Sequence, residues 1–142
     1  MKDRPQIRRI TRNDYQVVSL FLERMTKGVL AQSVWLDRFY LWWENNPAMQ
    51  DCKPYGWMIF LSDEEVKGFF CYIPVRYTYK GNDIIAYCAS SWYVEKEYRH
   101  LSLDLMKPFF IHNPPYLLLD TTPNKTAERI FSYYGLQRIT RK

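Results

Sequence analysis

The chain has 142 residues, of which 47% are hydrophobic and 18% aromatic, and its formal net charge is +5. That length suits one domain with one core, and the composition excludes the disordered, collagen-like and low-complexity classes. The charge favours an anionic partner but does not decide among a cofactor phosphate, a nucleic acid and an acidic protein. No apolar run approaches the roughly 20 residues of a membrane-spanning helix.

The ends and the metal-binding residue types give no sign of export or of a metal site. Residues 1–5 carry charges without a following apolar stretch, so no secretory signal is expected and the cytoplasm is the predicted compartment. Cys52, Cys71 and Cys88 lack a C-x-x-C spacing, which predicts reduced thiols. Cys71 and Cys88 lie in apolar runs, which favours core packing over nucleophilic chemistry. His100 and His112 also lack a paired ligand spacing.

The first part of the chain predicts one strand and two helices. The strand spans residues 7–10, and Thr11, Asn13 and Asp14 supply capping oxygens after it. The first helix has apolar residues at three- and four-residue spacing: Val18, Phe21, Leu22 and Met25. The second helix follows Ser33, ends near residues 46–47, and has an inward stripe that we expect to be core: Trp35, Leu36, Phe39, Trp42 and Trp43.

Three antiparallel strands joined by polar turns are expected next. They span residues 57–61, 66–79 and 84–94, with turns at residues 62–65 and 80–83. A helix that begins at Leu101 should be interrupted or ended by Pro108. The remaining sequence predicts a short buried strand at residues 116–120, a helix closed by Gly135, and a last strand at residues 136–139.

Two segments carry a resemblance to a known family. Residues 94–104, VEKEYRHLSLD, resemble the strand-to-helix motif V-x-P-x-Y-R-G-x-G-x-G of the GNAT superfamily of N-acetyltransferases. Residues 124–136, with Asn124, Ala127, Phe131 and Gly135, are similar to the motif N-x-x-A-x-x-L-Y-x-x-x-G-F. The resemblance covers about residues 7–139. It implies a single α+β domain of three α/β/α layers, in which helices flank a mixed, mostly antiparallel central sheet.

The same resemblance implies acetyl-CoA or another acyl-CoA as co-substrate. In the first motif the implied CoA-binding residues are Tyr93, Val94, Arg99, His100, Leu101, Ser102, Leu103 and Asp104. In the second they are Asn124, Ala127 and Phe131. Backbone N–H groups near Tyr93 and Val94 would hold the thioester oxygen, and N–H groups at the start of the following helix would hold the pyrophosphate.

Three glycines of the first motif are replaced in this chain. His100 and Ser102 occupy two of the positions, and Ser102 can still donate through its N–H and its hydroxyl. Asp104 occupies the third, and a carboxylate ~5 Å from a phosphate costs on the order of 3 kcal/mol at an effective dielectric of 20. Arg99, Lys107 or His100 would offset this cost. Alternatively, Asp104 turns to solvent and stabilises the helix N-terminus.

The residues that would move protons also depart from the family pattern. The usual acid is a tyrosine at the position of Phe131, which has no proton to give, and Tyr134 one turn later is the nearest substitute. Asp120 and Glu97 are candidate bases, and each is also interpretable as a capping or solvated carboxylate.

The favoured function is an acyl-CoA-dependent N-acyltransferase that moves an acyl group, expected to be acetyl, to an amine of a small molecule or an amino sugar. The changes at Phe131 and Asp104 leave open a catalytically inactive GNAT-like binding or regulatory module. A nucleic-acid-binding domain, suggested by the charge and by Tyr72, Tyr77 and Tyr79, is not expected, because those tyrosines need not share a face. A membrane is not expected as a partner.

The end of the sequence predicts contact with a second chain. The sequence stops at Lys142, just after the strand predicted at residues 136–139, whereas the fold normally continues into one more strand that pairs with it. An unpaired edge is a template for another strand. We therefore expect a homodimer through residues 136–139, with a longer protein as the alternative.

Overall fold

The computed structural model of the chain describes residues 4–49, 53–62, 65–111, 117–119 and 125–133. Within these residues, four strands pair antiparallel in chain order: β1 Gln6–Arg9, β2 Gly56–Phe60, β3 Val66–Tyr79 and β4 Asn82–Val94. A fifth strand, β5 Leu117–Leu119, pairs parallel with β4. The mixed, mostly antiparallel sheet predicted from the sequence is therefore confirmed.

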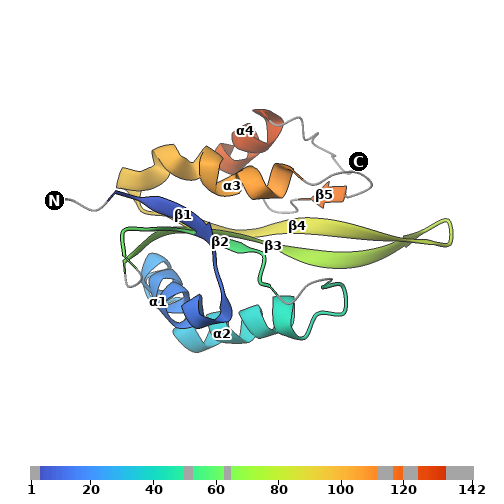
Figure 1. Cartoon of the computed structure of the whole chain (residues 1–142), viewed down its shortest axis with the longest axis horizontal. Helices are drawn as coiled ribbons and strands as arrows, with labels where there is room; N and C mark the ends of the chain where they lie inside the picture. The colour runs from blue at the N-terminus through green and yellow to red at the C-terminus, as the bar shows by residue number, and fades with distance from the viewer. Residues whose placement is uncertain (1–3, 50–52, 63–64, 112–116, 120–124, 134–142) are drawn as a thin grey trace.

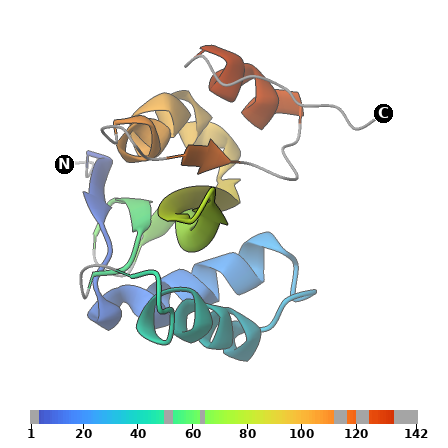
Figure 2. The same cartoon turned by 90° about the vertical axis from the view of Figure 1, so that its right-hand side faces the viewer.

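Helices cover both faces of this sheet, which gives the three layers seen in Figures 1 and 2. Helices α1 Tyr15–Met25 and α2 Gln32–Phe39 lie on one face. Helices α3 Ser102–Phe110 and α4 Lys125–Tyr133 lie on the other. No described helix is long and apolar enough to cross a membrane. The predicted end at Gly135 and the predicted strand at residues 136–139 lie outside the described residues.

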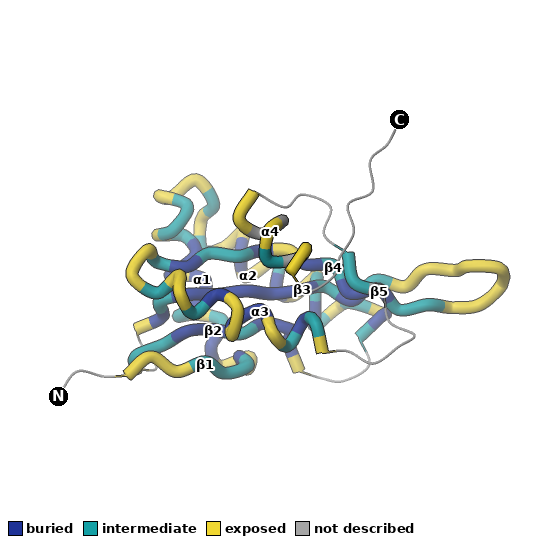
Figure 3. Tube along the Cα trace, turned by 90° about the horizontal axis from the view of Figure 1, so that it is seen from above, coloured by how far each residue is buried: buried dark blue, intermediate teal, exposed yellow. Residues whose placement is uncertain are grey.

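The hairpin of β3 and β4 turns within two residues. Lys80 and Gly81 have positive φ angles of 49° and 79°, which is typical of a type I′ turn between twisted strands. Asn82 and Asp83, expected in the turn, therefore belong to β4. The hairpin extends well beyond the helical layers (Figure 1), and its outer part is exposed while the central strands are buried (Figure 3).

Helix α2 begins earlier than its sequence predicts. Gln32, not a residue after Ser33, is its first residue, because the Glu23 carboxylate of α1 accepts a hydrogen bond from the Gln32 N–H at 3.2 Å. A π-helical turn, Tyr40–Glu44, extends the helix.

The aromatic stripe of α2 is core, as predicted, with two exceptions. Trp35, Phe39 and Trp43 are buried, and the Phe39 ring lies 5.1 Å from that of Trp43 and 6.0 Å from that of Phe69 in β3. Trp42 is partly buried, whereas Leu36 is exposed.

Helix α3 continues through Pro108, contrary to the interruption that the sequence predicts. Phe109 is fully buried on the opposite face of the sheet from α2, with its ring 5.8 Å from Phe70 and 5.3 Å from Tyr72. Burying such a ring contributes about as much as the roughly 3 kcal/mol that an interior proline costs. A 3-10 helix, Lys96–Leu101, precedes α3, so Leu101 is not its first residue.

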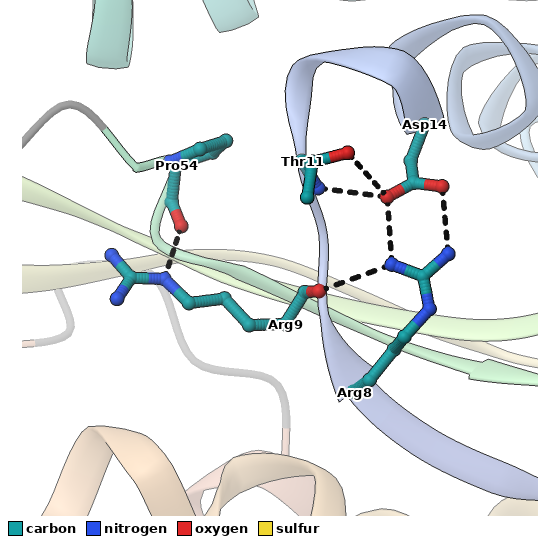
Figure 4. A network of polar contacts seen from close by, with 5 residues as sticks. All are labelled: Arg8, Arg9, Thr11, Asp14 and Pro54. Carbon is teal, nitrogen blue, oxygen red and sulfur yellow. Dashed lines mark hydrogen bonds and ion pairs between the residues drawn. The ribbon is translucent and has the colours of Figure 1, made fainter.

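A buried carboxylate joins β1 to the start of α1 (Figure 4). The two oxygens of Asp14 accept hydrogen bonds of 2.8 Å each from the Arg8 guanidinium, and one also accepts from the Thr11 N–H at 2.7 Å. Burial, the largest single influence, raises the pKa of Asp14, but the hydrogen bonds and charge of Arg8 and the hydrogen bonds of Thr11 outweigh it. The pKa therefore lies below its usual value.

The Asp14 network predicts a pH-dependent loss of stability in Asp14→Asn. A lowered folded-state pKa stabilises the protein above the unfolded pKa near ~3.9, and this contribution disappears as the pH falls through the folded pKa. We expect the variant to lose about 2 kcal/mol of unfolding free energy at neutral pH and progressively less in acid. Urea unfolding across this pH range measures the difference, and a loss that stays constant with pH would contradict the assigned charge.

Candidate active site at the open edge of β4

Strand β4 contains a bulge opposite Cys71. Phe70 pairs with Trp92 and Tyr72 pairs with Ala89, so one residue of β3 faces two residues, 90 and 91, of β4. A bulge bends the strand and changes which way the following side chains point. The sequence gives no signal for it, because no glycine or proline marks residues 89–92.

Beyond this bulge, β4 has a partner strand on one side only within the described part of the chain. Among the described residues, β5 pairs with β4 at Ala86, Tyr87 and Cys88 and no further (Figure 1). Residues 89–94 therefore have β3 on one side and no described strand on the other. We call the unpaired side of residues 89–94 the open edge of β4.

The backbone direction at the open edge follows from one hydrogen bond. The N–H of Glu95 donates to the Lys67 carbonyl of β3 at 2.9 Å. Successive N–H groups of an extended strand point to opposite edges, so the N–H of Tyr93 points toward β3 and that of Val94 points to the open edge. Of the two residues predicted to hold a thioester oxygen, Val94 therefore has its donor on the open edge.

The strand-to-helix junction lies next to the open edge. The Nε of Arg99 donates to the Val94 carbonyl at 3.5 Å, so this cationic side chain reaches the end of β4. The N–H of Ser102 donates to the Arg99 carbonyl, and the buried Ser102 hydroxyl has no hydrogen-bond partner among the described residues. Neither donor of Ser102 is therefore exposed to a phosphate in this conformation.

The other residues predicted at this junction are mostly at the surface. Arg99, His100, Leu103 and Asp104 are exposed, and Leu101 is partly buried. Asp104 lies in the first turn of α3, where a carboxylate favours the positive end of the helix dipole.

The structure locates only part of the predicted catalytic set. Glu97 is exposed in the 3-10 helix. Tyr134, Asp120 and Asn124 lie outside the described residues. Ala127 and Phe131 are in α4, and their side chains lie outside the description.

Glu95, which the sequence does not single out, ties three elements together beside the site. Its carboxylate lies 3.1 Å from Arg24 of α1 and 3.4 Å from Lys67 of β3. These ion pairs connect the end of β4 to the α1–α2 layer. The charge pattern alone could not reveal them, because the partners are 71 and 28 residues away in sequence.

A hollow of about 400 Å³ lies at the other edge of the sheet, beside the end of β1. Its two arginines already have partners: Arg9 donates to the Pro54 and Lys53 carbonyls at 2.7 and 3.0 Å, and Arg12 binds Glu44. In the described part of the chain, no group of three or more His, Cys, Asp or Glu residues could hold a metal. The open edge of β4 is therefore the better candidate site.

The three tyrosines behind the nucleic-acid alternative do not form one surface. Tyr72 is buried among aromatic rings on the α3 side of the sheet. Tyr77 and Tyr79 are exposed on the outer hairpin. Because Tyr72 and Tyr77 are an odd number of residues apart on one strand, they point to opposite faces.

Comparison with solved structures identifies the fold. A glucosamine-6-phosphate N-acetyltransferase from Arabidopsis thaliana matches with a TM-score of 0.67 at 9% identity, over 98% of this chain and 95% of that one. An aminoglycoside N-acetyltransferase bound to a CoA-containing bisubstrate analogue matches with a TM-score of 0.64 at 14% identity, over 98% and 95%.

An integron cassette protein of V. cholerae matches with a TM-score of 0.56 at 21% identity, over 100% of this chain and 90% of that one. No protein-family model and no curated protein matches the sequence. These likenesses show that the chain has the GNAT fold, as its motifs predicted.

The buried thiol of Cys71, opposite the bulge, leads to a testable prediction. The sequence already predicts that this residue packs in the core. Burial raises the pKa of its thiol to about 12, against smaller lowering effects of Ser91, Ser90 and Arg38. Because only the thiolate is a good nucleophile, we expect iodoacetamide at pH 8 to leave Cys71 unmodified in the folded protein and to alkylate it in denaturant. Mass spectrometry of the peptides measures this, and equal alkylation in both states would contradict the buried position.

Proposed function

We propose that the chain is an acyl-CoA-dependent N-acyltransferase that moves an acyl group, most simply acetyl, to an amine of a small molecule or an amino sugar. The observation that carries the proposal is the N–H of Val94 on the open edge of β4, next to the junction that resembles the acyl-CoA motif. An N–H held on a rigid strand can stabilise negative charge on an oxygen without reorganising.

The described residues fit an acyl-CoA thioester at this edge. The Val94 N–H would hold the thioester oxygen, and the exposed side chains of Arg99 and His100 would face the phosphates. The Ser102 N–H donates to the Arg99 carbonyl. In the proposal, the side chains of Arg99 and His100 therefore replace this backbone donor. The Asp104 carboxylate remains in solvent in the first turn of α3, where it stabilises the helix.

The thioester supplies an electrophilic carbonyl and a good leaving group. In the transfer, the acceptor nitrogen forms a bond to that carbonyl carbon while the bond from carbon to sulfur breaks. The amine loses a proton and the departing sulfur gains one. We keep Glu97 and Asp120 as proposed bases and Tyr134 as the proposed acid, on the resemblance and the sequence spacing alone.

Calorimetric titration with acetyl-CoA tests the proposal. We expect saturable binding, and we expect Arg99→Gln to weaken it roughly tenfold, because one charge-assisted contact to a phosphate is lost. Arg76→Gln on the outer hairpin removes the same charge far from the open edge and is expected to leave binding unchanged.

A coupled assay for released CoA thiol, with a panel of primary amines, separates the two functional hypotheses. Turnover supports the transferase. Acetyl-CoA binding without turnover of any amine would favour the inactive binding module. No heat with millimolar acetyl-CoA would contradict the transferase and would also favour the inactive module.

A further inference from the structure

Arg38 of α2 is a partly buried cation without a counter-charge in the described structure. Its guanidinium carbon lies 5.0 Å from the ring centre of Trp35 and 6.0 Å from that of Trp42. Among the described residues, it forms no hydrogen bond or ion pair with a protein group. Contact with two indoles removes water from the guanidinium and supplies no oxygen acceptor, so the five N–H donors favour an acceptor from outside the chain.

Ring contacts connect Arg38 to the open edge of β4. The ring of Trp35 meets that of Tyr93 edge-on at 5.9 Å, and Tyr93 directly precedes Val94. The Trp35 indole N–H is itself buried and has no hydrogen-bond partner among the described residues. Two unmatched donor groups thus lie on the α2 side of the candidate site.

No described carboxylate forms an ion pair with Arg38. Glu44 binds Arg12 and the Tyr15 hydroxyl, and Glu95 binds Arg24 and Lys67. Glu23 accepts from the Gln32 N–H. Asp37 is exposed, and neighbouring residues of a helix do not face each other. The positive charge is therefore available to a ligand that approaches the open edge from the α2 side.

We propose that Arg38, held between Trp35 and Trp42, binds an anionic group of the acceptor amine. This inference rests on the proposed acyl transfer, because it places the acceptor on the α2 side of the edge that would receive the thioester. A carboxylate is the expected anion, since a single planar guanidinium matches its two oxygens, and a phosphate has the same charge chemistry. Polycationic amines such as aminoglycosides are expected to be poor acceptors, because the same charge repels them.

Direct binding measurements test the anion site without requiring turnover. Tryptophan fluorescence, with Trp35 and Trp42 as reporters beside Arg38, follows titration with glycine, alanine, phenylalanine and lysine and with the amide of each. We expect at least one free amino acid to bind ten or more times more tightly than its amide. Glucosamine 6-phosphate against glucosamine, measured in the same way, distinguishes a phosphate from a carboxylate.

Substitutions of Arg38 supply the control. Arg38→Gln should abolish the preference for the charged ligand, and Arg38→Lys should restore part of it, because the charge returns without the planar fork. Arg76→Gln should leave the preference unchanged. A preference that survives in Arg38→Gln, or equal binding of every acid and its neutral counterpart, overturns the inference. A variant that loses charged and neutral ligands equally also overturns it, because that result indicates a structural role.

Acetyl-CoA titration of Arg38→Gln separates this inference from the proposed function. We expect unchanged acetyl-CoA binding, which also shows that the variant is folded. If the native chain fails to bind acetyl-CoA but shows the Arg38-dependent preference, the transferase proposal fails and the anion site stands. If acetyl transfer occurs with no preference for anionic amines, the anion site fails and the transferase proposal stands.

Discussion

The candidate site depends on the unequal pairing of β4. In the described structure, the pairing of β4 with β3 extends to Val94, whereas the pairing of β4 with β5 ends at Cys88. A backbone polar group inside a sheet normally has a partner, so an unpaired stretch is a place where a ligand can pair with the strand. The Arg99 side chain donates a hydrogen bond to the Val94 carbonyl. The N–H of Val94 remains available to that ligand. The proposed position of the thioester follows from this asymmetry.

Two aromatic cores hold the open edge in place. On one face, Phe39 and Trp43 pack on Phe69, and on the other, Phe109 packs on Phe70 and Tyr72. Phe69 and Phe70, which are consecutive in β3, thus pack against opposite helical layers. This packing fixes β3, the strand with which β4 pairs. The ion pairs of Glu95 then attach the end of β4 to the α1–α2 layer, where Arg38 lies.

The spacing of apolar residues predicts most of the fold, because it indicates directly which side chains are buried. The three central strands and the first two helices follow from apolar spacing, and the junction motif marks the right end of β4. Features that depend on distant residues are not visible in the sequence: the cap on α2 comes from Glu23, and Pro108 is tolerated because Phe109 is buried. The bulge has no sequence signal. In the sequence, Arg38 also looks like any other charged residue on a helix, and only the structure shows its contacts with Trp35 and Trp42.

Amide hydrogen exchange at the end of β4 tests the central claim most directly. The amides of Tyr93 and Val94 are adjacent in sequence but point to opposite edges, so they control for each other. We predict that Tyr93 exchanges slowly with or without acetyl-CoA, because its N–H faces β3. Val94 should exchange rapidly in the free protein and slow down when acetyl-CoA is added. A Val94 amide that is already protected without ligand, or that acetyl-CoA leaves unchanged while it binds, would contradict the account.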